Sequence, residues 1–347
     1  MRKFLRTIAL LTLLAVVVLG AAGAAIYMRT GQPYRGYQGP EQFVDIPPGS
    51  STKTIGDRLV AAGVVRDLPT YRLSMVLSGQ ARGLKAGEYR FDQPMTPLEV
   101  LGKIARGDVY SIVITFPEGL TIAEMAAIAE SHGLGRASAF VGAARDRALI
   151  RTLDPVAQDL EGYLFPETYR VGRHTDPSAL VRLMVGRFER VFSPELRRAA
   201  EQHGLSVHQL VVLASLVEKE TARADERPIV AAVYLNRFRR GMVLQCDPTI
   251  IYALQRDGKY TGNLHREDLA LDSPYNTYRY AGLPPGPIAA PGRASLEAVS
   301  NPADVDYLYF VSRNDGSHEF AATLAEHNRN VQKYQVQYFR DRKLSGH

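Results

Sequence analysis

Tryptophan is absent from this chain of 347 residues, and cysteine occurs once, at Cys246. A single cysteine excludes an intrachain disulfide and any metal site built from several thiolates. Stacking on a ligand must therefore come from the 18 tyrosines and 12 phenylalanines. The net charge of +6 is mild, and no basic stripe interleaved with aromatic residues occurs. Nucleic acid is therefore not an expected partner.

Several catalytic signatures are missing too. The closest approach to a zinc-binding HExxH motif begins at His318, but position 322 is alanine, so the second histidine ligand is lacking. The chain has no G-x-S-x-G nucleophile elbow and no G-x-x-x-x-G-K-[ST] phosphate loop. His208 and His265 stand alone, as surface or core histidines do. We expect no metal and no cofactor.

The N-terminal segment predicts a membrane anchor. Residues 8–28 (IALLTLLAVVVLGAAGAAIYM) contain one polar side chain, Thr12. As a helix this segment would span about 30 Å, the thickness of a bilayer core. Basic residues precede it, and the positive-inside rule then leaves residues 1–7 in the cytoplasm. A cleaved signal peptide is the alternative, because Ala22-Gly23-Ala24 resembles a cleavage site. Either way the rest of the chain is exported.

The exported part divides by composition. Residues 29–42 are rich in glycine, proline and polar groups, which indicates a linker. Residues 43–153 alternate short strands and capped helices, and they contain a weak internal repeat, FVDIPPGSSTKTIGDRLVAAGVV and IVITFPEGLTIAEMAAIAESHGL. The repeat resembles the LysM-like modules that bind glycan strands. Two ordinary α+β packing units would give the same pattern.

Residues 154–345 have a different texture and predict a mixed α/β domain. A helix should start at Ser206, where Gln209 completes a capping box, and run through LASLVEKET at 213–221. That helix is apolar on all sides from Leu210 to Val217 apart from one serine, so we expect it to be central and buried. The fold class is therefore α+β, with an N-terminal transmembrane helix, LysM-like modules and a domain around a buried helix.

Glu218 is the candidate catalytic residue on this helix. At 100° per residue it continues an apolar line of Val207, Val211 and Ala214, near the C-terminal end of the helix. Desolvation and the negative end of the helix dipole both raise a carboxyl pKa, as a general acid requires. The alternative is a glutamate in a fraying last turn, paired with Lys219, Arg223 or Arg227.

Further polar and aromatic residues follow. Asp247, before Pro248, is expected to cap the helix at LQCDPTIIYAL. The segment SPYNTYRYAGLPPGPIAAPG is a long loop in which Tyr275 and Tyr278 could stack on sugar rings and Asn276 could bond hydroxyls. The tail around YLYFVSRNDGSHEF predicts a hairpin with an NDG turn, followed by a final helix.

Together these blocks resemble the YceG-like family of endolytic murein transglycosylases. The resemblance rests on EGYLFPETY, LASLVEKET, NR…GM.LQ.DPT.IY, YNTY…GLPPGPI..PG and H.F..TL.EHN, which occur in the family's order. Two residues depart from the family's pattern. Threonine or serine is expected at the position of Cys246, and glycine at the position of Ala253. By resemblance, Glu218 is catalytic, and the protein cuts the MurNAc–GlcNAc β-1,4 bond of nascent peptidoglycan strands beside penicillin-binding synthases, leaving 1,6-anhydro-MurNAc ends.

The resemblance also implies where the protein works and which residues help Glu218. It implies a single-pass protein of the inner membrane with its catalytic domain in the periplasm. Because the sugar's C6 hydroxyl replaces water, one carboxyl group can serve first as acid and then as base. The residues expected to hold substrate or stabilise the oxocarbenium-like state are Glu161, Tyr163, Glu167, Asn236, Gln245, Asp247, Tyr275, Asn276 and Tyr278. For the acidic members, capping or ion pairing with nearby arginines is the alternative.

Two other functions remain open from the sequence. A non-enzymatic, membrane-tethered glycan-binding protein would explain residues 43–135 but not the Glu218 helix. A lysozyme-type hydrolase would use the same residues but leave a reducing end. A substitution of the catalytic carboxyl group separates the first alternative, and the chemistry of the product end separates the second.

Overall fold

The computed structural model describes residues 2–80 and 82–340. The chain forms two compact units, Met1–Ser111 and Ile112–His347. The sequence predicted a division between residues 153 and 154. The structure instead joins residues 112–153 to the second unit, because strand β3 (Ile112–Thr115) pairs with β4 (Thr168–Val171) in an antiparallel ladder.

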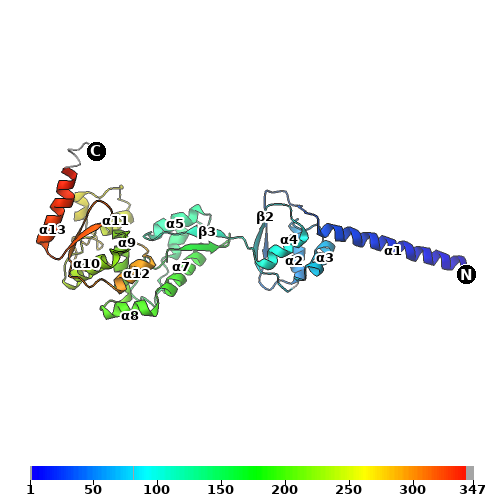
Figure 1. The fold of residues 1–347 in the computed structure, drawn as a ribbon, viewed down its shortest axis with the longest axis horizontal. Helices are drawn as coiled ribbons and strands as arrows, with labels where there is room; N and C mark the ends of the chain where they lie inside the picture. Colours follow the sequence, from blue (N-terminus) through cyan, green and yellow to red (C-terminus); the bar gives the residue numbers. More distant parts are fainter. Residues whose placement is uncertain (1, 81, 341–347) are drawn as a thin grey trace. The chain divides into compact units, whose positions relative to one another are not determined.

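The first unit begins with a long helix, α1 (Arg2–Thr30), drawn in blue in Figure 1. Its stretch Phe4–Thr30 is long and apolar enough to cross a membrane, and none of its most hydrophobic window is buried within the protein. The C-terminal end of α1 packs against α3 (Leu68–Ser78), where Arg29 forms a 3.2 Å ion pair with Asp67. The predicted linker is held to this unit by backbone bonds between Tyr34 and Met95.

The remainder of the first unit is a small α+β fold. Strands β1 (Gln42–Ile46) and β2 (Gly87–Phe91) pair antiparallel, with α2 (Thr52–Ala61) and α3 between them in the chain and α4 (Pro97–Arg106) after them. Ser51 caps α2, and Thr96 with Glu99 forms a capping box on α4. Buried side chains from both strands and all three short helices form one hydrophobic core.

The second unit is mainly helical. Its elements are α5 (Ile122–Ser131), α6 (Ala137–Ala143), η1 (Arg147–Leu149), α7 (Pro177–Val191), α8 (Pro194–Gln202), α9 (Val207–Glu220), α10 (Arg227–Arg239), α11 (Asp247–Arg256), η2 (Arg266–Ala270), α12 (Arg293–Ser300), β5 (Tyr309–Ser312), β6 (His318–Ala321), α13 (Leu324–Val331) and the π-helical η3 (Gln332–Gln337). β5 and β6 form the predicted hairpin, with Asn314 and Gly316 at positive φ in its turn.

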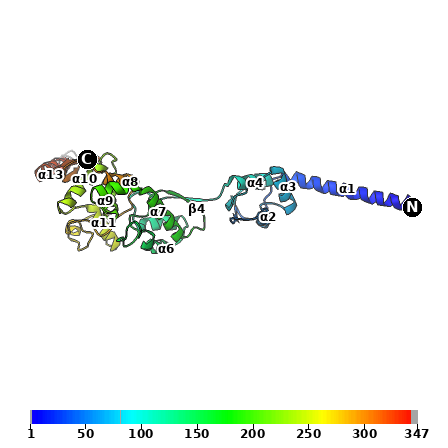
Figure 2. The same cartoon turned by 90° about the horizontal axis from the view of Figure 1, so that it is seen from below.

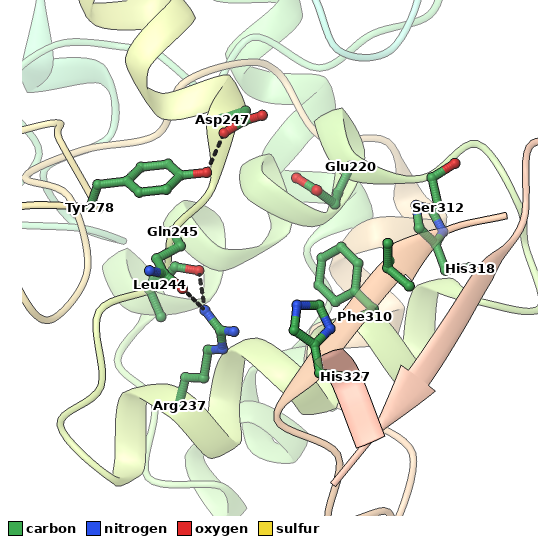
Figure 3. A pocket seen from close by; sticks show the side chains of 11 residues that line it. Glu220, Arg237, Leu244, Gln245, Asp247, Tyr278, Phe310, Ser312, His318 and His327 are labelled. Atoms are coloured by element: carbon green, nitrogen blue, oxygen red, sulfur yellow. Dashed lines mark hydrogen bonds between the residues drawn. The ribbon is translucent and has the colours of Figure 1, made fainter. Parts of the chain in front are cut away.

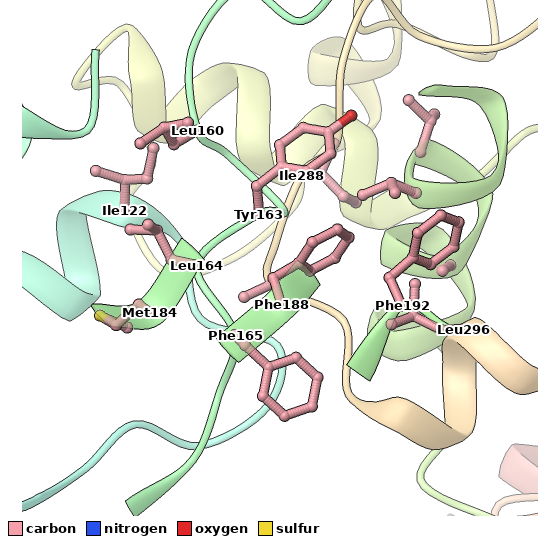
Figure 4. Close-up of a cluster of buried hydrophobic side chains, with 14 of the residues drawn as sticks. Ile122, Leu160, Tyr163, Leu164, Phe165, Met184, Phe188, Phe192, Ile288 and Leu296 are labelled. Atoms are coloured by element: carbon pink, nitrogen blue, oxygen red, sulfur yellow. The ribbon is translucent and has the colours of Figure 1, made fainter. Parts of the chain in front are cut away.

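Helix α9 occupies the interior of this unit. Every residue from Leu210 to Val217 is buried, and the helix packs against α8, α10, α11 and α12 (Figures 1 and 2). Its N-terminus has the predicted capping box of Ser206 and Gln209. The surrounding core includes Tyr163, Phe188 and Ile288, shown in Figure 4. The end of α9 is thereby fixed against the core, and this rigid end carries the two glutamates of VEKE.

Candidate active site

A polar cavity of about 330 Å³ opens at the C-terminal end of α9. Side chains from α9, α10, α11, α13, both strands of the hairpin and two loops line it, as Figure 3 shows. The lining residues are Glu220, Arg237, Leu244, Gln245, Asp247, Tyr278, Phe310, Val311, Ser312, His318 and His327. The cavity thus brings together the LQ.DPT, YNTY and H.F..TL.EHN blocks, which are far apart in the sequence.

Glu220, the last residue of α9, presents its carboxyl group to this cavity. Burial raises the pKa of Glu220, and the nearby charge of Asp247 raises it further, while His318 lowers it. The thiol of Cys246 lies 3.5 Å from Oε2 of Glu220. A carboxyl group at the end of a helix, desolvated and close to a second carboxylate, tends to stay protonated near neutral pH. Glu220 is therefore equipped to act as a general acid.

Asp247, Tyr278 and Gln245, which the sequence analysis expected to hold substrate beside Glu218, line the cavity with Glu220. The Tyr278 hydroxyl donates a short hydrogen bond to Oδ1 of Asp247, so Asp247 faces the cavity instead of capping α11, whose N-cap is Cys246. Gln245 has a positive φ of 53°, and its Oε1 accepts a 3.3 Å hydrogen bond from Arg237. The buried Arg237 also binds the Leu244 carbonyl at 2.9 Å, which fixes this wall.

Glu218 faces different surroundings. Its side chain is only 6% exposed and does not line the cavity. Oε2 accepts hydrogen bonds from the Gly292 amide at 2.9 Å and the Ser295 hydroxyl at 2.7 Å, at the start of α12, and Oε1 lies 3.7 Å from Arg227. These contacts match the ion-pair alternative considered from the sequence. They join α9 to α12 and leave the carboxylate engaged on both oxygens.

Glu118 is a neighbour that the sequence reasoning passed over. The Glu118 carboxylate lies against the Cα of Gly292, where a Cβ would meet it. Burial raises the pKa of Glu118, and the Glu218 charge raises it further. The backbone of Gly119 bonds to Ala290 at 2.8 Å, which ties this turn to the loop before α12. The signal for Glu118 in the sequence is its place in a Pro-Glu-Gly turn, a pattern that equally suits a purely structural turn.

The other two predicted glutamates lie outside the cavity. Glu161 is buried: its Oε1 accepts from the Ile122 amide at 3.0 Å and its Oε2 from the Tyr252 hydroxyl at 3.1 Å. Burial, with the Asp159 charge, raises the pKa of Glu161 to about 8. Glu167 forms a two-pronged ion pair with Arg187. Both residues therefore have the capping or ion-pair roles considered as alternatives.

The remaining predicted contacts are also held by the protein itself. Tyr163 is fully buried and donates to Asp154, which also binds His208 at 2.7 Å. The Asn236 amide donates to the Val305 and Tyr307 carbonyls, and buried Asn276 organises its own turn through the Leu269 and Leu271 carbonyls. Tyr275 is buried against Tyr252. Among residues 2–80 and 82–340, no cluster of histidine, cysteine or acidic residues could hold a metal ion.

The fold and the cavity define a class of protein: an α+β chain with an N-terminal membrane-type helix and a buried carboxyl group at a polar cleft. The chain belongs to the YceG-like family, whose model matches residues 44–333. It is 33% identical over 310 residues to an endolytic murein transglycosylase of Bacillus subtilis, covering 84% of each chain.

A second relative and a solved structure agree. An endolytic murein transglycosylase of Streptococcus pneumoniae is 32% identical over 329 residues, which cover 84% of this chain and 58% of the relative. A YceG-like protein of Listeria monocytogenes, known from a 2.6 Å crystal structure, is 30% identical with a TM-score of 0.57. That match covers 84% of this chain and 98% of the other.

Proposed function

We propose that this protein is a membrane-anchored lytic transglycosylase that cuts peptidoglycan glycan strands within the chain. Its membership of the YceG-like family and the names of its curated relatives support this activity. Helix α1 supplies the anchor, with its basic N-terminus in the cytoplasm and the chain after α1 on the outer side of the membrane, in the periplasm. The bond cut is the β-1,4 bond between MurNAc and GlcNAc.

The general acid in this proposal is Glu220, in place of Glu218. The single observation that carries the choice is that Glu220 lines the polar cavity, whereas Glu218 is engaged by Gly292, Ser295 and Arg227. Burial raises the pKa of Glu220, so the carboxyl group can keep its proton until the glycosidic oxygen gains negative charge as its bond to C1 breaks. Of the residues predicted to bind substrate, the proposal retains Gln245, Asp247 and Tyr278.

The reaction needs one proton transfer to the leaving oxygen and one away from the attacking oxygen. Glu220 donates its proton to the glycosidic oxygen as the bond from C1 of MurNAc breaks, and GlcNAc leaves with a 4-hydroxyl group. The C6 hydroxyl oxygen of the same MurNAc then bonds to C1 and gives its proton to the Glu220 carboxylate, which closes the 1,6-anhydro ring and restores the acid. Asp247 carries a negative charge beside the site and can stabilise the oxocarbenium-like state between these steps.

The first test compares carboxyl variants in the full-length protein, solubilised in detergent. Wild type, Glu220→Gln and Glu218→Gln are incubated with nascent uncrosslinked glycan strands, and the ends are analysed by mass spectrometry. We expect anhydro ends from wild type and from folded Glu218→Gln, and none from Glu220→Gln. Loss of anhydro ends in folded Glu218→Gln only would restore Glu218 as the acid. Reducing ends would indicate a hydrolase, and retention without cleavage by wild type would indicate a glycan-binding protein.

The first unit supports a second part of the proposal, that the protein holds glycan strands while it cuts them. Its β1–α2–α3–β2 order, with an antiparallel strand pair, fits the LysM-like modules that the sequence resembles.

An endolytic cut beside a penicillin-binding synthase would end strand elongation. A coupled reaction with such a synthase tests this: strands should become shorter when wild type is present, but not when Glu220→Gln replaces it. Unchanged strand lengths would contradict the role in termination.

A further inference from the structure

A histidine–carboxylate pair adjoins the cavity and has no part in the one-carboxyl reaction described above. Nδ1 of His318 lies 2.6 Å from Oε2 of Glu226, and the His318 backbone amide donates to Oε1 of Glu226 at 2.9 Å. Both side chains are largely buried, with 14% and 8% of their surfaces exposed. Two bonds to one carboxylate fix the position and the plane of the imidazole ring.

Glu226 is itself fixed by its neighbours. It precedes α10, its Oε2 accepts from the Thr221 hydroxyl at 3.3 Å, and Arg223 lies 3.4 Å from its Oε1. Phe310 packs edge-on against the His318 ring with centroids 5.3 Å apart, and Phe320 contacts it at 6.3 Å. The ring therefore has little freedom to turn, and this rigidity favours a role that depends on direction.

The contact with Glu226 determines which nitrogen of His318 is available. An ionised carboxylate accepts the Nδ1 hydrogen, which leaves the lone pair of a neutral imidazole on Nε2. Among the described residues, none forms a hydrogen bond with Nε2. His318 lines the cavity that Glu220 faces, so the imidazole and the Glu220 carboxyl group share one site (Figure 3).

We propose that His318, held by Glu226, is the base that removes the proton from the C6 hydroxyl, while Glu220 acts only as the acid. This inference rests on the proposed transglycosylase function. Two separate groups remove the need for Glu220 to lose a proton to one oxygen and collect another from a second oxygen within the same event. Glu226 is a positioning residue, because it acts through His318.

The step balances with these groups alone. The bond from C1 to the glycosidic oxygen breaks, and that oxygen keeps the bonding electron pair and accepts the proton from Glu220. The bond from O6 to C1 forms, and the O6 proton passes to Nε2 of His318. The enzyme then holds a glutamate anion and an imidazolium cation, and transfer of the proton from His318 to Glu220, directly or through water, restores the starting state.

Other charged groups border the same cavity. Asp247 and Tyr278 lie on the wall opposite the hairpin, Arg237 comes from α10, and His327 comes from α13. Burial, with the Arg237 charge, lowers the pKa of His327, which keeps that ring neutral. Its Nδ1 is buried without a hydrogen-bond partner among the described residues. His327 has no carboxylate to orient it, so His318 is the histidine prepared for directed proton transfer.

The test measures how the product ends divide between anhydro and reducing forms. In detergent-solubilised, full-length protein, we expect His318→Gln to form anhydro ends about 10²-fold more slowly, in the range of general-base contributions. Acid-assisted cleavage of the glycosidic bond continues in this variant. Water then attacks C1 more often in place of O6, so the fraction of reducing ends rises. Glu226→Gln should change the same fraction less, because it loosens the ring without removing it. His132→Gln is the matched control, because His132 is an exposed histidine at the C-cap of α5.

Chemical rescue separates catalysis from a structural effect. His318→Ala leaves a space that free imidazole can enter, and added imidazole should restore anhydro ends in proportion to its concentration. An unchanged ratio of product ends in folded His318→Gln, or a slow His318→Ala that imidazole does not restore, would overturn the inference. If wild type itself releases no anhydro ends, the proposed function has failed, and that outcome is distinct from a failure of His318 alone.

Discussion

Glu218 and Glu220 lie two positions apart at the end of α9, yet their carboxyl groups enter different surroundings. Glu218 contacts the start of α12, and Glu220 faces the polar cavity. Residues two positions apart on a helix differ by about 200° around its axis, so the two side chains leave the helix on nearly opposite sides. One helix thus uses the first glutamate to hold α12 and presents the second to the polar cavity.

The Glu218–Ser295 contact predicts a stability effect without a catalytic one. A buried hydrogen bond to a charged group contributes about 1.5–3 kcal/mol, so Ser295→Ala should lower the free energy of unfolding by about that amount. Because Ser295 lies outside the cavity, turnover per folded molecule should stay near that of wild type. Urea unfolding and glycan-cleavage assays check the two quantities. A stable Ser295→Ala variant with turnover reduced 100-fold would contradict the structural role of Glu218.

Much of the fold could be predicted from local patterns. The capping boxes at Thr96, Thr121 and Ser206 were recognisable, because each begins a helix with a hydroxyl residue and has a glutamate or glutamine three positions later. The Asn-Asp-Gly sequence predicted the hairpin, because these residue types favour the tight turn that joins two antiparallel strands. The domain boundary was not predictable from local pattern, because the pairing of β3 with β4 joins segments more than 50 residues apart.

The choice between the two glutamates could not be made from periodicity. Helix α9 is buried on all sides, so its apolar pattern has no polar face to show which direction leads to the cavity. At 100° per residue Glu220 lies nearly opposite Glu218, but both directions lead into the protein. Asn276 shows a related limit: an asparagine suited to sugar hydroxyls is equally suited to organise its own turn, and here it bonds two backbone carbonyls.

The buried Glu161 predicts a stability that falls as pH rises. Its pKa is about 8 in the folded protein, against an ordinary value of 4.5, so the unfolded chain ionises first. The group therefore stabilises the fold fully at low pH, and that contribution is lost between about pH 4.5 and 8. Glu161→Gln resembles the protonated form and should flatten the dependence, leaving the variant more stable than wild type at pH 8 by a few kcal/mol at most, about the scale of such shifts.

Thermal unfolding of wild type and Glu161→Gln between pH 5 and pH 8 measures this effect. Glu41→Gln is the control, because Glu41 is a surface residue with 42% of its side chain exposed. Parallel curves for wild type and Glu161→Gln would show that Glu161 ionises alike in the folded and unfolded states.

Cys246 provides a third prediction. Its thiol is fully buried beside Glu220, and burial raises its pKa well above the ordinary value. The thiolate is the reactive form, so iodoacetamide at pH 8 should leave the native protein unlabelled over hours and label it fully in denaturant. Mass spectrometry of the intact chain counts the label directly, since no other cysteine is present. Rapid labelling of the native protein would mean that the cavity wall opens around Cys246.

Asp247 and Tyr278 together predict how the pH dependence of cleavage responds to charge. The Asp247 charge raises the pKa of Glu220, so Asp247→Asn should lower it. Because Glu220 must be protonated to act as the acid, the loss of activity at high pH should then begin at a lower pH in Asp247→Asn than in wild type. Tyr278→Phe removes the hydrogen bond to Asp247 but keeps the charge, so its high-pH limb should stay much closer to that of wild type. The limbs are read from kcat/KM for glycan cleavage between pH 4 and pH 9. If the high-pH limb moved equally in both variants, or moved in neither, the charge of Asp247 would not control the pKa of Glu220.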